Sequence, residues 1–135
     1  MEWSRQATAS LRLLANLSWI DRTTDTRGFR AEFGASQAAA DWMGNLALFW
    51  KVAPQTLFTA RWNYVGDRPP ENENGYGLFD LVLSRRDLFA PGLTVRAMVK
   101  NAFDDDVFYI QESPTGAAAL QFPGRSVLLQ AVWNR

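Results

Sequence analysis

The chain of 135 residues has no cysteine and no histidine, and its 14 basic residues balance its 14 acidic residues. Without those two side chains, structural zinc sites, thiol catalysis and histidine-dependent acid–base chemistry are excluded. The balanced charge argues against a nucleic-acid partner, which would require a basic excess. With no Ser-His-Asp set, phosphate loop or carboxylate dyad in the sequence, we expect neither an enzyme nor a bound metal or cofactor.

Long apolar runs are also lacking. No stretch of about 18 apolar residues exists, so the sequence predicts no transmembrane helix. The first residues, Met1–Gln6, lack the apolar region of a signal peptide. We therefore expect that the chain is a piece of a longer protein or that its start is wrongly assigned. Its length fits one domain, which we take as residues 1–135.

Aromatic residues and a period of two dominate what is present. The chain has six Trp, nine Phe and three Tyr, and apolar residues alternate with polar ones along most of its length. This period is typical of β-strands with two different faces. The fold class we predict is all-β, an antiparallel meander of about six long amphipathic strands. We place the strands at residues 3–20, 41–52, 55–66, 76–86, 92–102 and 125–133.

The predicted connections alternate in length. Short turns lie near Ala53 and between Arg86 and Gly92, whereas the stretches 21–40, 67–75 and 102–124 are long and polar. Short turns at one end and long loops at the other are typical of outer-membrane β-barrels. With a turn centred on Ala53, Trp50 would lie opposite Thr56, which places the apolar residues of both strands on one face.

Alternation alone does not decide which face meets water, because a soluble barrel points its apolar face inward and a membrane barrel points it outward. Bulky charges at mid-strand, tryptophans at the ends of the apolar faces and the loop asymmetry favour the membrane. The predicted lumen-facing residues are Arg12, Arg61, Asp80, Arg96 and Lys100. The predicted lipid-facing and girdle residues are Trp19, Trp42, Trp50, Trp62, Tyr64 and Trp133.

Four stretches, Arg61–Pro69, Tyr76–Leu81, Val99–Asp104 and Pro123–Val127, resemble in order the C-terminal barrel strands of TonB-dependent outer-membrane receptors. The motif residues are Asn101, Phe103, Asp104, Pro123, Gly124 and Arg125. Ala102 stands where the family usually has Leu, and Arg135 where it usually ends on an aromatic residue.

This resemblance implies a location in the bacterial outer membrane and energy-coupled uptake of a ferric siderophore, cobalamin or a glycan. It also implies as partners the membrane lipid, the remaining barrel strands and plug, TonB and the barrel-assembly machinery. The chain has no plug and about six strands, so we expect the closing segment of a receptor that cannot transport alone.

Each candidate site has a plainer interpretation. Asp104–Asp106 could bind a hard cation or could form a solvated corner. Asp80 and Arg96 would face each other if a turn centres on Leu88, lining a substrate path or forming a lumen ion pair. Arg12, Arg61 and Lys100 could attract an anionic ferric chelate or could simply line a polar interior.

In the last long connection, Phe108, Tyr109 and Gln111 could contact the ligand or pack within the loop.

The alternative to the receptor segment is a small complete β-barrel, acting as a soluble carrier of an apolar ligand or as part of a multi-chain membrane barrel. About six strands are too few to enclose the inward side chains, because single-chain bacterial barrels start at about eight. We therefore expect an open curved sheet with unpaired edges.

Overall fold

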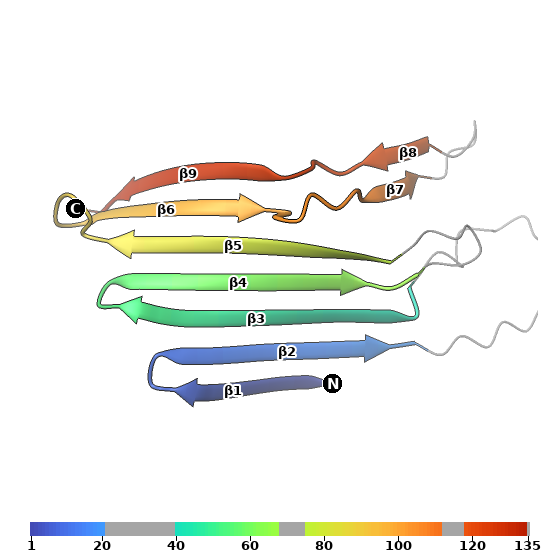
Figure 1. The fold of residues 1–135 in the computed structure, drawn as a ribbon, viewed down its shortest axis with the longest axis horizontal. Coiled ribbons are helices and arrows are strands. Elements are labelled where there is room, and N and C mark those ends of the chain that lie inside the picture. The colour runs from blue at the N-terminus through green and yellow to red at the C-terminus, as the bar shows by residue number, and fades with distance from the viewer. Residues whose placement is uncertain (21–39, 68–74, 112–117, 135) are drawn as a thin grey trace, which may run out of the picture.

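The computed structural model describes residues 1–20, 40–67, 75–111 and 118–134, with only the backbone for 108–111 and 118–120. The main sheet is one antiparallel meander of seven strands in the order β1-β2-β3-β4-β5-β6-β9 (Figure 1). Its strands are β1 (Glu2–Thr8), β2 (Leu11–Trp19), β3 (Trp42–Ala53), β4 (Thr56–Val65), β5 (Tyr76–Arg86), β6 (Leu93–Lys100) and β9 (Ser126–Trp133).

The all-β meander is confirmed for the described residues, which form no helix, and so none that could cross a membrane. The sheet is also open as expected, because β1 and β9 have no contact with each other. The alternative interpretation included a small β-barrel completed by this chain alone. The described residues do not form one.

The first predicted strand, residues 3–20, is wrong in one respect: it is a hairpin of β1 and β2. The chain reverses at Ala9 and Ser10, where the Ser10 N–H donates to Thr8 Oγ1 at 3.3 Å and the two hydroxyl oxygens lie 3.2 Å apart. Hydroxyl groups that bond to nearby backbone stabilise turns without Gly or Pro. This turn raises the number of strands in the sheet to seven.

The turn between β3 and β4 lies one residue later than predicted. Ala53 pairs with Thr56, a bulge falls between Lys51 and Ala53, and Gln55 takes the positive φ of 64°. Trp50 consequently lies opposite Phe58 rather than Thr56. Since the resulting slip is two residues, it leaves every side chain on its predicted face.

The turn between β5 and β6 also centres later than predicted, near Ala90. Asp87 and Gly92 both have positive φ, and the Gly92 N–H donates to Asp87 Oδ1 at 2.7 Å. Arg96 therefore lies opposite Ser84, and the predicted pairing of Asp80 with Arg96 is wrong.

The sheet is a single layer. One face, here called the apolar face, carries the odd-numbered residues of β2, β5, β6 and β9, the even-numbered residues of β3 and β4, and Trp3 and Arg5 of β1. Its charged side chains within the seven strands are Arg5 and Arg85. The opposite side is the polar face. Within the seven strands only Thr59 and Thr94 are buried, and both lie on the polar face. No residue of the apolar face is buried, so these strands have no hydrophobic core of their own.

The three tight turns lie at one end of the sheet and the ends of the three long connections at the other (Figure 1). The last long connection, predicted only as a long polar stretch over residues 102–124, also contains regular structure. It contains β7 (Phe108–Gln111) and β8 (Ala118–Gln121), which pair as a two-stranded antiparallel sheet.

Candidate functional site

The polar face brings three of the five predicted lumen residues into one row across the strands. Arg61 on β4 lies directly opposite Asp80 on β5, and continuing the register by one pair places Lys100 opposite Asp80. The Asp80 carboxylate also accepts a hydrogen bond from the Asn101 N–H at 3.0 Å. Asp80 therefore both separates two cations and ties the end of β6 to β5.

Arg12 and Arg96 lie on the same face in other rows. Arg12 pairs across the sheet with Gln6 and Phe49, and the Arg96 guanidinium donates to Gln130 Oε1 at 3.1 Å. The five predicted residues therefore share a face without forming one compact cluster.

The polar face is electropositive although the whole chain is neutral. Its acids within the seven strands are Glu2 and Asp80. Its bases there are Arg12, Lys51, Arg61, Arg86, Arg96 and Lys100. The acidic residues gather instead in the turns and connections, such as Asp87 and Asp104–Asp106. A surface with this excess attracts anions.

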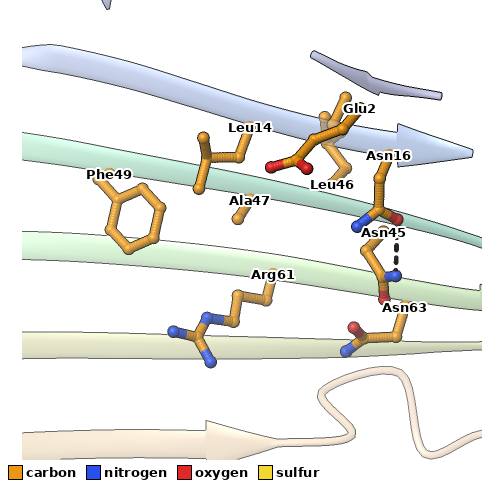
Figure 2. A pocket seen from close by; sticks show the side chains of 10 residues that line it. Glu2, Leu14, Asn16, Asn45, Leu46, Ala47, Phe49, Arg61 and Asn63 are labelled. Atoms are coloured by element: carbon orange, nitrogen blue, oxygen red, sulfur yellow. Dashed lines mark hydrogen bonds between the residues drawn. The ribbon is translucent and has the colours of Figure 1, made fainter. Parts of the chain in front are cut away.

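A hollow of about 250 Å³ lies over the N-terminal half of the polar face (Figure 2). An asparagine from each of three neighbouring strands, Asn16, Asn45 and Asn63, forms a ladder at its side, and Asn45 Nδ2 donates to Asn16 Oδ1 at 2.8 Å. Arg61 and Glu2 complete its polar lining. Sequence reasoning missed this ladder, because asparagines far apart in the chain align only once the register is known.

All six predicted girdle residues lie on the apolar face. Trp19 and Trp42 stack with ring centroids 5.8 Å apart, and the rings of Trp62 and Tyr64 lie 5.6 Å apart. These two pairs come from the half of the sheet nearer the long connections. Trp50 and Trp133 lie towards the tight turns. The aromatic side chains thus gather towards both ends of the apolar face.

The motif residues build a corner that joins β6 to β9. Asn101 is 4% exposed; its side chain donates to Asp105 O at 2.8 Å and accepts from Asp105 N at 3.0 Å. Asp104 Oδ1 accepts from the Arg125 N–H at 2.6 Å, and a Cβ on Gly124 would lie only 2.8 Å from that oxygen.

Phe103 follows Asn101 in this corner and stacks on Phe79 of β5, with ring centroids 5.1 Å apart. Pro123 precedes the close approach at Gly124. The motif therefore has a structural role at the end of the sheet, whatever else it does.

The carboxylates of Asp104 and Asp106 are engaged by protein groups. Asp104 lies 3.8 Å from the Arg125 guanidinium, and Asp106 Oδ1 accepts from Gln121 Nε2 at 3.2 Å. Across the described ranges, no three acidic side chains are grouped to hold a metal ion. Asp104 and Asp106 therefore lie in a corner held by protein groups, and cation binding by Asp104–Asp106 stays a prediction.

The three loop candidates, Phe108, Tyr109 and Gln111, belong to β7, and their side chains lie outside the described part of the structure. Their role in ligand binding stays a prediction.

Comparisons of the chain with protein-family models, with curated proteins and with solved structures found no match.

Proposed function

We propose that this sheet forms part of the wall of a transmembrane β-barrel in a bacterial outer membrane. The observation that carries the proposal is the apolar face, which runs across all seven strands without one buried residue. Six spacings of ~4.8 Å by a ~25 Å strand length give a face of about 700 Å². Soluble monomers rarely expose an apolar patch of more than about 300–600 Å².

A lipid bilayer covers such a face without any further protein. The aromatic residues at its two ends fit the belts at the two membrane–water interfaces, where indole and phenol rings meet both apolar and polar surroundings. The opposite face, with Arg61, Asp80 and Lys100, requires water or a polar partner. Outward apolar and inward polar side chains are the arrangement of membrane barrels.

The resemblance of the motifs supports a more specific proposal, that the barrel belongs to a TonB-dependent receptor that imports a ferric chelate or a similar nutrient. The corner built by Asn101, Asp104 and Arg125 gives those motif residues a shared structural task at the start of the last strand. The electropositive polar face suits the passage of an anionic solute.

Two alanines offer a matched test of the membrane part. Ala47 and Ala60 are both half-buried, lie on neighbouring strands and face opposite sides of the sheet. Because the chain has no cysteine, Ala47→Cys and Ala60→Cys each carry a single label.

After reconstitution in phosphatidylcholine vesicles, we expect a fluorophore on residue 60 to be quenched by a lipid-soluble quencher, and one on residue 47 by a water-soluble quencher. If both labels respond to the aqueous quencher, or if the chain stays in solution without lipid, the membrane proposal fails in favour of a soluble carrier.

The receptor part has its own test in the genomic DNA upstream of the Met1 codon. A reading frame that continues upstream through further amphipathic strands, a plug and a signal peptide would support it. A frame that ends immediately upstream would refute the receptor proposal but would not affect the proposal of a barrel wall.

A further inference from the structure

The sheet ends in two open edges, β1 and β9. All seven residues of β1 are exposed, and six of the eight residues of β9 are exposed. Neither strand has a neighbour on its outer side among the described residues. In lipid an open edge is costly, because no water is present to satisfy its N–H and C=O groups. The barrel proposal therefore requires something to pair with both edges.

The two edge strands run in the same direction. Each neighbouring pair in the sheet is antiparallel, so strand direction reverses at every step. Six reversals separate β1 from β9, and both arrows consequently point the same way (Figure 1). If β1 and β9 paired with each other, the seam would be parallel.

This direction limits what can close the sheet. Bacterial outer-membrane barrels of one chain are antiparallel throughout and have an even number of strands. Any segment that pairs antiparallel with both β1 and β9 must begin and end on strands running opposite to them. Only a segment with an odd number of strands meets that condition.

A second copy of this chain does not fit. A copy inserted in the same direction brings β9 against the β1 of its neighbour and makes a parallel seam. A copy in the opposite direction allows antiparallel β1–β1 pairing, but Arg5 is the central residue of Glu2–Thr8 and lies opposite its own copy when the two strands align in full. Like charges directly opposite each other destabilise a strand pair.

Arg5 also lies on the apolar face, opposite Leu13. A charge on the apolar face of an edge strand discourages pairing between identical edges.

We infer that the partner completing this sheet is a different polypeptide segment with an odd number of antiparallel β-strands, whose outer strands run opposite to β1 and β9. This inference rests on the proposed membrane barrel and adds to it the kind of partner that closes the wall. In the receptor interpretation, that partner is the N-terminal remainder of the same barrel.

The test adds strands of the chain itself ahead of Met1 through a flexible linker. One extension repeats residues 11–19 (one strand), a second repeats residues 42–65 (two strands), and a third joins both (three strands). Each outermost added strand carries one cysteine, and Leu128→Cys marks β9. Intramolecular disulfide formation in vesicles then reports whether the outermost added strand lies next to β9, and the dependence on strand number reports the direction of that pairing.

We expect the disulfide yield to be high for odd and low for even extensions. The better of the one-strand and three-strand extensions should exceed the two-strand extension several-fold. A two-strand yield as high as both odd extensions, or a steady rise with strand number, would overturn the inference.

The unextended chain with Ser4→Cys and Leu128→Cys supplies the control for copies. We expect no disulfide-linked pairs of chains from it. Efficient cross-linking between copies, either β1–β1 or β1–β9, would also overturn the inference. The label at residue 60 keeps the two proposals separable. If the lipid-soluble quencher acts on this label and an even number of added strands gives the higher disulfide yield, only the odd-stranded partner is refuted. If the water-soluble quencher acts on the label, the membrane barrel itself is refuted.

Discussion

Two neighbouring leucines on β9 offer the sharpest test of which face meets lipid. Leu129 lies on the apolar face and is 79% exposed, and Leu128 lies on the polar face and is 42% exposed. Trp133 is four residues beyond Leu129 on the same face, about 13 Å along the strand at ~3.3 Å per residue. With a tilt of ~40° the separation becomes about 10 Å along the membrane normal. If Trp133 lies in an interfacial belt, Leu129 then lies near the middle of the ~25 Å apolar band.

An arginine facing lipid near the midplane costs about 2–4 kcal/mol. We therefore expect Leu129→Arg to lower the free energy of unfolding by that amount relative to Leu128→Arg, a ratio of about 30 to 900 in the equilibrium constant. The two variants make the same substitution on the same edge strand, so any cost of the open edge is common to both and cancels.

The measurement is a urea titration of tryptophan fluorescence, with each variant reconstituted in phosphatidylcholine vesicles. Equal losses for the two variants would refute the assignment of faces. A larger loss for Leu128→Arg would reverse that assignment and would favour a soluble carrier with its apolar face turned inward.

The same titration checks three local predictions. Asp104→Ala removes the acceptor for the Arg125 N–H and should lower the free energy of unfolding by about 1–2 kcal/mol. Asp104→Asn keeps an acceptor oxygen and suits the φ of 63°, so it should lower that free energy less. An equal loss for Asn and Ala would contradict this role of Asp104. Asn101→Ala should cost about 2–3 kcal/mol, because two part-buried hydrogen bonds disappear and Ala must hold a φ of 49°. Asn101→Gly should recover only the part of this loss that comes from the backbone conformation. Gly77→Ala should displace the indole of Trp62, whose Nε1 would lie 2.5 Å from the new Cβ, and an unchanged fluorescence spectrum would exclude that contact.

The sequence predicted faces better than it predicted pairing. The run at residues 41–52 became β3 (Trp42–Ala53), and the run at 76–86 became β5 (Tyr76–Arg86). The alternation survives because a side chain's face depends only on whether its position is odd or even within its strand. A slip of two residues at the β3–β4 turn therefore left Trp50 on the apolar face while changing its partner.

Pairing depends on turn geometry, which the residue types only partly specify. Pro54 suits the first central position of the tight turn Ala53–Thr56, but the bulge before Ala53 and the positive φ of Gln55 give no comparable signal in the sequence. At the next turn the Asp87 carboxylate binds the backbone of Gly92 and closes a longer loop. For this reason Arg96 lies opposite Ser84, and continuing the register places Lys100, not Arg96, opposite Asp80 on the β6 side.

The turn at Ala9 and Ser10 shows how far one missed reversal can reach. Read as a single strand, residues 3–20 leave six strands, and the first and last strands of a six-stranded meander run in opposite directions. The edges of such a meander could pair antiparallel with each other or with a second copy, although six strands alone are too few to close a barrel. The added reversal makes seven strands, so β1 and β9 run the same way. Neither direct closure nor closure with a copy running in the same direction is then antiparallel. If the sheet forms a barrel wall as proposed, a hydroxyl-stabilised turn of two residues therefore determines the number of strands that its partner must have.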